Sequence, residues 1–580
     1  MAINNPLIPG DPYSYDLKWL VAKVKEILAQ LGTLDEAIEA KIFKGFLEHS
    51  VVQFKTVEEM LAADIVDGSI VLTLGYHEAG DLGGLFYLVK DFNPSQCALD
   101  YFLTMDNNAQ IAIPVIVTPY VTPEMFGAYG DAINDDTDAI RKAFNYGVIR
   151  MTKKYKITDT VDIMSDQKVL CDGEIFFDID QTGFSSTVKL FSDNNTSNFS
   201  WYGGKIYSIG AAEPNYLSIF YFENAENITF ENVKFENVPV TFCISFWRSK
   251  NLIVKDCYIN HYSYGGICFY DGSENGLAEG NTIKNLDVPG NGTGYPLSLS
   301  GGLSGSFSIS KNIRALHNVI DNSETIARWE GIDAHGGDGL IIAENIIRGC
   351  ITGIMAANGD QREYDLIRTQ VVNNIVYGRN DGSTGYGLAI SGKDVIVDGN
   401  IVEGFTQTLQ SAGIYTRFSD GIVYRNNRIK NCSCGVIFSK GDGPVKFEGN
   451  TFEDCGRYPN SGAYPAIREF DQQTYTEFID NTFIRSQGEY DIRSYALNDV
   501  YLRFSGNRFI DSVNSYSSGT NTFISDIRSG APTQSDTRMG KLGDICKLAA
   551  PRPGYPYEWI CTAAWDPSTQ TVTWTALPNL

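Results

Sequence analysis

Short runs of alternating apolar and polar residues fill the chain from about residue 227 to residue 509. Most of them end at a turn that contains asparagine, as in VIVDGNIV (395–402), GIVYRNNRI (421–429), PVKFEGNTF (444–452) and VYLRFSGNRF (500–509). A side-chain period of two is typical of β-strands, and none of these copies shows a helical period. The pattern predicts short strands joined by turns.

One asparagine holds the same place in each copy, and we call it the marker. The intervals between markers are 37, 27, 29, 26, 27, 23, 31 and 26 residues, and two earlier copies with Val233 and Cys257 in this place lie 24 residues apart. A repeat of this length is the signature of a solenoid, in which each coil buries its inner side chains only by stacking. We expect an all-β fold, a parallel β-helix whose stacked marker amides form a hydrogen-bonded ladder. The markers are Asn281, Asn318, Asn345, Asn374, Asn400, Asn427, Asn450, Asn481 and Asn507.

Three cysteines support the same register. Cys350, Cys432 and Cys455 each follow a marker by five residues. Residues in the same phase of different coils share one corner of a solenoid. We therefore expect buried free thiols there rather than disulfides or metal ligands.

The segments outside the repeat predict three further domains. Residues 1–49 are expected to form a helical attachment and trimerisation segment that self-associates, because Leu17, Leu20, Val24, Ile27 and Leu31 make a 3-4 alternation typical of a coiled-coil seam. The alternative is an amphipathic helix that lies on its own domain. Residues 50–120 mix one helical signal with short β runs and form a small α+β stem. Residues 121–530 form the β-helix, and 531–580 a small C-terminal β domain.

Charge and composition exclude several classes of partner. The net charge of −24 opposes binding to nucleic acid phosphates and to an anionic membrane surface. No apolar run approaches 18 residues, so no membrane insertion is expected. The 11 cysteines are an odd number without paired spacing, and the first residues show no export signal, which favours assembly in a reducing cytoplasm.

The segment TPEMFGAYGDAINDDTDAIRKAF (122–144) resembles the motif that opens the right-handed β-helices of the pectate-lyase-like superfamily, especially phage tailspike and tail-appendage proteins. Two positions depart from the usual motif, Ala132 in place of glycine and Ile133 in place of valine. Asp135 or Asp136 is expected to cap a helix over residues 137–146. The residues that match are Phe126, Gly127, Ala128, Gly130, Asp131, Asp135, Asp136, Thr137, Ala139 and Ile140.

The resemblance implies a right-handed β-helix in a homotrimer on a phage virion, assembled in the bacterial host cytoplasm. It also implies phage tail proteins as partners through the N-terminus, and a bacterial surface polysaccharide as the ligand. No cofactor and no metal ion are expected.

A second strand in each coil has the form Gly-Ile-x-apolar-x, and its two alternate positions are expected to face outward. Aligned over the coils, these positions are rich in aromatic, acidic and arginine side chains, which suit a polysaccharide. We expect a flat binding platform there. Its predicted substrate-binding residues are Trp247, Tyr270, Trp329, Tyr415, Arg417 and Arg468.

The coil from residue 328 to residue 338 holds the predicted catalytic residues Glu330, Asp333, His335 and Asp338. Asp333 and His335 should share the outer face. Hydrolysis of a glycoside needs two carboxyl groups. Asp333 can pair with Glu330 if the strand begins at Gly331, or with Asp338 if the chain turns back, and His335 can act as a general base or orient an acid.

These residues predict an enzyme that depolymerises polysaccharide by glycoside hydrolysis. A polysaccharide lyase is one alternative, in which a histidine or an arginine removes a proton next to a uronate carboxylate; Arg417, Arg468 or Arg493 could serve. A second alternative is a receptor-binding adhesin without enzymatic activity. A secreted pectate-lyase-like enzyme is disfavoured because no export signal is visible.

Overall fold

The computed structural model divides the chain into two compact units, which are described separately. The first comprises Met1–Ser185, Leu190–Ser192 and Ser197–Ala211, and the second comprises the remainder. The residues described are 51–92, 101–178, 189–193, 195–209, 218–238, 242–287, 294–301, 308–325, 329–358, 366–379, 383–408, 410–438, 441–456, 467–469, 473–485, 492–494, 501–510, 516–517, 522–528, 545–548, 558–566 and 571–576. The predicted coiled-coil seam lies outside these residues. Among them, no helix is long and apolar enough to cross a bilayer.

The first unit begins with a five-stranded sheet and one short helix. The strand order is β1-β2-β3-β5-β4, for β1 (Val52–Phe54), β2 (Ile70–Thr73), β3 (Phe86–Asp91), β5 (Gln110–Val115) and β4 (Leu103–Thr104). Helix α3 (Val57–Leu61) starts where the Thr56 side chain accepts a hydrogen bond from the Glu59 N–H at 3.1 Å. Val57 and Met60 of this helix are buried. The helix and the β runs are those that the sequence predicted for the stem.

The first coil follows this sheet. It opens with the 3-10 helix η2 (Pro123–Phe126), strand β6 (Asp131–Asp135) and helix α4 (Thr137–Ala143). Asp135 accepts a hydrogen bond at 3.0 Å from the N–H of Thr137, the first residue of α4. Asp136 is the N-cap residue but makes no side-chain cap bond; its carboxylate accepts from the N–H groups of Tyr129 and Gly130. The helix ends at Ala143 rather than at residue 146. The strands of this unit are β7 (Val148–Met151), β8 (Lys154–Ile157), β9 (Val161–Asp162), β10 (Lys168–Cys171), β11 (Glu174–Asp178), β13 (Ser197–Tyr202) and β14 (Lys205–Ile209), and β12 (Lys189–Ser192) has residues in both units.

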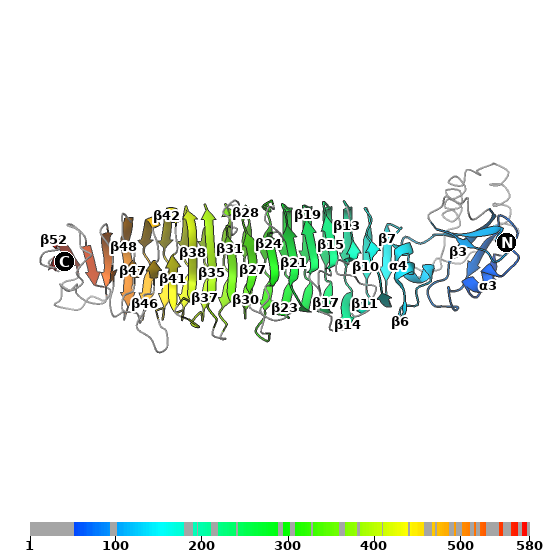
Figure 1. Ribbon diagram of the computed structural model, residues 1–580, viewed down its shortest axis with the longest axis horizontal. Coiled ribbons are helices and arrows are strands. Elements are labelled where there is room, and N and C mark those ends of the chain that lie inside the picture. The colour runs from blue at the N-terminus through cyan, green and yellow to red at the C-terminus, as the bar shows by residue number, and fades with distance from the viewer. Residues whose placement is uncertain are drawn as a thin grey trace, which may run out of the picture. The chain divides into compact units, whose positions relative to one another are not determined.

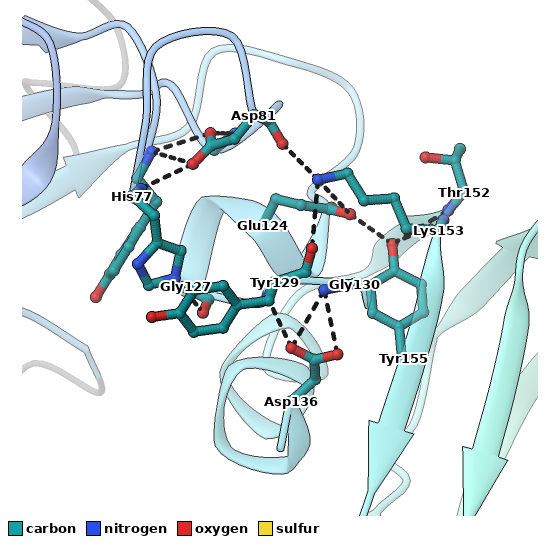
Figure 2. Close-up of polar contacts among 12 residues, drawn as sticks. His77, Asp81, Glu124, Gly127, Tyr129, Gly130, Asp136, Thr152, Lys153 and Tyr155 are labelled. Atoms are coloured by element: carbon teal, nitrogen blue, oxygen red, sulfur yellow. Dashed lines mark hydrogen bonds and ion pairs between the residues drawn. The ribbon is translucent and has the colours of Figure 1, made fainter. Parts of the chain in front are cut away.

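A polar network fastens the stem sheet to this first coil (Figure 2). Lys153 donates to the Asp81 carbonyl oxygen at 2.8 Å, and its ammonium lies 4.0 Å from the buried Glu124 carboxylate. Tyr155 donates to Glu124 at 2.8 Å. Burial would raise the pKa of Asp81, but four main-chain N–H donors of the 76–83 turn outweigh burial and hold this pKa below its usual range. The turn is therefore ordered by one carboxylate and joined to the coil by one lysine.

In the second unit each coil contributes three strands to three stacked rows (Figure 1). Strands of the same row pair in parallel from coil to coil, for example Ile342 with Val371 and Ile347 with Val376. Inward positions are aliphatic or aromatic and fully buried, as at Ile320, Ile347 and Val402. This is the parallel β-helix that the repeat predicted.

The bounds of these strands are as follows. The first row, before the marker, contains β16 (Glu226–Glu231), β19 (Lys250–Lys255), β22 (Glu274–Glu279), β25 (Arg314–Leu316), β29 (Ile341–Ala343), β33 (Gln370–Val372), β36 (Ile396–Asp398), β39 (Ile422–Arg425), β42 (Gly441–Glu448), β45 (Gln473–Ile479) and β48 (Tyr501–Ile510). The second row, after the marker, contains β17 (Lys234–Val238), β20 (Tyr258–Tyr262), β23 (Thr282–Leu286), β26 (Val319–Asp321), β30 (Ile346–Arg348), β34 (Ile375–Tyr377), β37 (Ile401–Glu403), β40 (Arg428–Lys430), β43 (Thr451–Glu453) and β46 (Thr482–Ile484). The third row contains β15 (Ser218–Glu223), β18 (Phe242–Trp247), β21 (Gly265–Tyr270), β24 (Tyr295–Ser300), β27 (Glu330–His335), β31 (Thr352–Ala357), β35 (Tyr386–Lys393), β38 (Ala412–Asp420), β41 (Cys434–Phe438), β44 (Ile467–Glu469), β47 (Ile492–Ser494) and β49 (Tyr516–Ser517).

Two short strands stand outside the rows, β28 (Gly337–Asp338) and β32 (Leu366–Ile367). At the C-terminal end, β50 (Thr522–Arg528) and β51 (Ile545–Leu548) continue the parallel pairing. The last strands, β52 (Glu558–Asp566) and β53 (Thr571–Ala576), pair antiparallel.

The marker asparagines form the predicted ladder. From Asn318 onward, each marker side-chain oxygen accepts two hydrogen bonds from the marker of the preceding coil, one from its main-chain N–H and one from its side-chain amide, at 2.9–3.0 Å. The side-chain amide of each marker donates its other hydrogen back to a main-chain carbonyl oxygen of the coil before it. For example, the Asn374 amide donates to the Ile342 carbonyl oxygen at 2.9 Å. The markers are fully buried, and all of their polar groups are used.

The residue before each marker makes the bend possible. Asn232, Asp256, Gly280, His317, Glu344, Asn373 and Gly399 all have a positive φ between 52° and 68°. Glycine and asparagine tolerate this left-handed conformation, whereas His317 and Glu344 adopt it against their steric preference. The positive φ recurs because every coil bends at the same place.

The cysteine prediction is confirmed. Cys350, Cys432 and Cys455 are all buried and free. Burial raises the pKa of the Cys350 thiol to about 12, so the thiol stays protonated.

We predict that Asn374→Ala lowers the free energy of unfolding by about 3 kcal/mol or more, because two donors of Asn345 and the Ile342 carbonyl oxygen lose their buried partner. Denaturant unfolding followed by circular dichroism measures this change. The matched control is Asn275→Gly, at an exposed asparagine with φ +57°, where glycine keeps the conformation. Equal losses in the two variants would contradict the prediction.

Candidate functional site

The candidate site lies on the outer face of the third row, where β24 and β27 are neighbours. Leu297 pairs with Ile332 and Ser298 pairs with Asp333. Ile332 and Ala334 face the core and are fully buried, so Asp333 and His335 lie on the opposite face of the strand. The two side chains share one face, as the sequence predicted.

Asp333 and His335 form a close pair. His335 Nε2 lies 3.2 Å from Asp333 Oδ1, and Ser298 donates a hydrogen bond to Asp333 Oδ2 at 3.1 Å. The Asp333 side chain is 2% exposed, whereas the His335 side chain is 25% exposed. The pair therefore consists of a buried carboxylate and an imidazole that reaches the surface.

Asp333 lies on the outer face, as expected, but it is buried there. Burial raises the pKa of Asp333, and His335 and the Ser298 hydroxyl offset only part of this effect. A carboxylate in this setting can orient its histidine.

Tyr295 completes the immediate surroundings. Its ring lies edge-on to the His335 ring, with the centroids 6.3 Å apart. Burial raises the pKa of the Tyr295 hydroxyl, and the negative charges of Asp333 and Glu330 raise it further. The phenol therefore stays protonated and lies close to both carboxyl groups.

Glu330 lies on the outer side because the strand alternation breaks at Gly331. A Cβ on Gly331 would meet Ile347 Cγ2 at 2.6 Å, so this residue points toward the core, as Ile332 does. Two inward positions in succession place Glu330 and Asp333 on the same side. Strict alternation would have separated them.

Asp338 belongs to a different contact. Strand β28 places it beside Arg368, whose Nε donates to Asp338 Oδ1 at 2.9 Å. Arg368 Nη2 lies 2.6 Å from the same oxygen. Asp338 thus serves a surface ion pair, and the predicted pairing of Asp338 with Asp333 is wrong.

The expected open aromatic platform is wrong at its N-terminal end. Trp247 is 8% exposed and Tyr270 is 3% exposed. Both pack in an outer cluster with Phe242 and Cys268, which Tyr221 and Tyr264 cover. Large rings in successive coils cover one another, so facing outward does not mean being accessible.

The other predicted binding residues lie in different surroundings. Trp329 precedes Glu330 and is 36% exposed. Tyr415 is partly buried and stacks on Tyr386 at 4.5 Å, and Arg417 is exposed with its guanidinium over the Phe418 ring. The Arg468 side chain lies outside the described residues. Of the predicted binding residues, only Trp329 lies next to strand β27, which carries Asp333 and His335.

Sequence reasoning missed Tyr295 and Ser298. The third-row strand of their coil reads YPLSLS and lacks the Gly-Ile start that aligned the other coils. Its register with β27 appears only in the structure. The 37-residue interval between Asn281 and Asn318 was the one available signal.

Comparisons with known proteins agree with the fold. Residues 185–376 match the family described as a right handed beta helix region, and residues 302–502 match the family described as periplasmic copper-binding protein (NosD). Each match covers less than half of the chain. Among the described residues no group of three His, Cys, Asp or Glu side chains could hold a metal ion. No curated protein matches the sequence.

Solved structures with this fold have diverse roles. A tailspike protein of Escherichia coli bacteriophage HK620 in complex with a pentasaccharide is 13% identical, with 80% of this chain and 94% of that chain covered and a TM-score of 0.50. A surface adhesin of Streptococcus pneumoniae is 18% identical, with 58% and 91% covered and a TM-score of 0.44. A mannuronan C-5 epimerase module of Azotobacter vinelandii is 13% identical, with 71% and 100% covered and a TM-score of 0.35. At 13% identity the likeness to the tailspike shows the β-helix fold and nothing finer.

We predict that the free energy of unfolding of Asp333→Asn, measured relative to that of the wild type, increases as the pH rises. A carboxyl group whose folded pKa is raised contributes stability below its unfolded pKa of about 4, and loses it as the pH rises through the folded pKa. The amide has no such loss. Thermal unfolding of both proteins at pH 4 and pH 7 measures the difference.

Asp338→Asn is the control, because it removes only the partly exposed partner of Arg368 and should change stability by less than about 1 kcal/mol. A free energy of unfolding of Asp333→Asn that falls relative to that of the wild type as the pH rises would contradict the burial argument.

Proposed function

We propose that this chain is a tail spike of the phage type, whose β-helix binds a bacterial surface polysaccharide and cleaves it at the Asp333–His335 pair. The observation that carries the proposal is the contact between a fully buried carboxylate and a partly exposed histidine. The similarity of the opening motif to phage tail proteins supports the virion, the tail-protein partners and the homotrimer. The fold shared with a tailspike in complex with a pentasaccharide supports a saccharide ligand.

His335 is the proposed proton-transfer residue. Asp333 Oδ1 lies 3.2 Å from His335 Nε2 and orients the imidazole, so Asp333 is the proposed positioning residue. In hydrolysis, His335 takes a proton from water while the water oxygen attacks the anomeric carbon. Glu330 is the proposed acid that protonates the departing oxygen, because the break at Gly331 puts it on the same face.

A second candidate reaction is β-elimination next to a uronate carboxylate. The contact of the His335 ring with Tyr295 favours it, since a base and a neutral phenol are together suited to remove a proton and to return one to the leaving oxygen. Trp329, exposed beside Glu330, is the proposed stacking surface for a sugar ring in either reaction.

We predict that His335→Ala and Asp333→Asn each lower the rate of polysaccharide shortening by about 100-fold or more, the usual contribution of a general acid or base. The assay incubates the protein with a panel of bacterial surface polysaccharides and scores chain length, new reducing ends and ultraviolet-absorbing unsaturated ends. Reducing ends without unsaturation assign hydrolysis, and unsaturated ends assign elimination.

His317→Ala and Asp338→Asn are matched controls on the same rod, since both residues serve exposed ion pairs. If the protein binds a polysaccharide but does not shorten it, the proposal of cleavage is overturned and the protein is a non-enzymatic adhesin. Equal activity in the His335 and His317 variants would overturn the site.

A further inference from the structure

The outer face of the third row becomes uncharged directly after the Asp333–His335 pair. In the next strand, β31, Met355 pairs with Asp333 and Ala357 pairs with His335. Both residues are partly exposed, whereas Ala356 between them faces the core and is fully buried. The nearest outward neighbours of the pair on this side are therefore a thioether and a methyl group, about 5 Å away.

The same character continues through the two strands that follow, β35 and β38. We call the residues in register with Glu330 and Asp333 on β31, β35 and β38 the uncharged columns. Two of them, Tyr386 and Tyr415, are partly exposed and stack with their ring centroids 4.5 Å apart. None of the six is acidic or basic. The columns hold Thr352, Tyr386 and Ala412 after Glu330, and Met355, Ala389 and Tyr415 after Asp333.

The cations on the neighbouring segments have contacts of their own. Lys393, at the end of β35, lies 3.5 Å from Asp420. Arg379, at the corner before β35, donates to the Gly349 carbonyl oxygen at 3.2 Å. The Arg417 guanidinium lies over the Phe418 ring in β38, further along the row.

A sugar carboxylate on the uncharged columns would be poorly accommodated. It would lie beside the carboxyl groups of Glu330 and Asp333, and no lysine or arginine of the columns would pair with it. Loss of hydration without a partner and repulsion between like charges both cost free energy. A methyl group has neither cost, and the flexible thioether of Met355 can adapt to its shape.

We propose that the sugar bound at the Asp333–His335 pair is uncharged and carries a methyl-bearing substituent, which packs on Met355 and Ala357. The shared chemistry is the methyl group, whether of a 6-deoxy sugar, an O-acetyl ester or an N-acetyl amide. The inference rests on the proposed function, since it takes the pair as the saccharide site. It also selects between the two candidate reactions, because β-elimination needs a uronate carboxylate and hydrolysis does not.

An array of defined oligosaccharides tests the substrate class, with the full-length His335→Ala protein as the probe for binding without turnover. The array has four groups: neutral sugars without a methyl-bearing substituent, 6-deoxy sugars, acetylated sugars and uronates. We expect binding to be confined to the second and third groups. Mild alkali removes O-acetyl esters but leaves N-acetyl and 6-deoxy groups, so treated copies of the bound sugars identify the source of the methyl group.

The outcomes separate this inference from the proposed function. Preference for uronates, or equal binding of neutral sugars with and without a methyl-bearing substituent, overturns the inference and leaves a saccharide-binding protein. Binding to none of the four groups, together with no shortening of polysaccharide by the wild type, overturns the proposed function and the inference with it.

Substitution of Met355 tests the contact itself. We expect Met355→Ser to weaken binding of the methyl-bearing oligosaccharide by about 10-fold or more, the usual effect of losing an apolar contact of this size. Met355→Leu should stay within about 3-fold of the parent protein, because it keeps an apolar side chain of similar volume. The matched control is Ile253→Ser, at an isoleucine 38% exposed on the first row, which should bind as the parent does.

Circular dichroism first establishes that each variant is folded. A folded Met355→Ser variant that binds as tightly as its parent overturns the contact. Equal losses in the Met355→Ser and Ile253→Ser variants overturn it as well.

Discussion

The fold depends on one hydrogen-bonded column, the marker ladder. Each marker amide forms three hydrogen bonds to the coil before it. The polar groups of the column are therefore already paired when the coils are in register. A coil displaced by one residue would leave buried amides and carbonyl groups without partners, at a cost of about 1–3 kcal/mol each. The ladder therefore fixes the register of all three rows, including the rows that carry no asparagine.

This register produces the candidate site. Ser298 lies next to Asp333 because β24 and β27 belong to adjacent coils, although 35 residues separate the two along the chain. The same alignment brings Tyr295 to His335. Placing a carboxylate in this buried position costs free energy, which raises the pKa of Asp333. A group kept at such a cost beside an accessible histidine is typical of a functional site rather than of a structural core.

The sequence predicted what depends on one coil repeated many times. The marker period predicted the β-helix, the ladder and the buried cysteine corner, because identical coils must superpose their equivalent residues. It also placed Asp333 and His335 on one face. It could not predict which outward side chains are exposed to solvent, because Trp247 and Tyr270 are buried by aromatic rings from other coils. It could not predict Tyr295 or Ser298, because their coil departs from the pattern, nor the position of Glu330, which depends on the break at Gly331.

Hydrogen–deuterium exchange tests the ladder most directly. The main-chain N–H groups of Asn345, Asn374, Asn400 and Asn427 are each bonded to the marker of the next coil. If these bonds hold the coils in register, peptides containing these residues exchange together and only at the rate of unfolding of the whole β-helix. Rapid and independent exchange at these positions, in a protein whose stem strands β3 and β5 remain protected, would contradict the account.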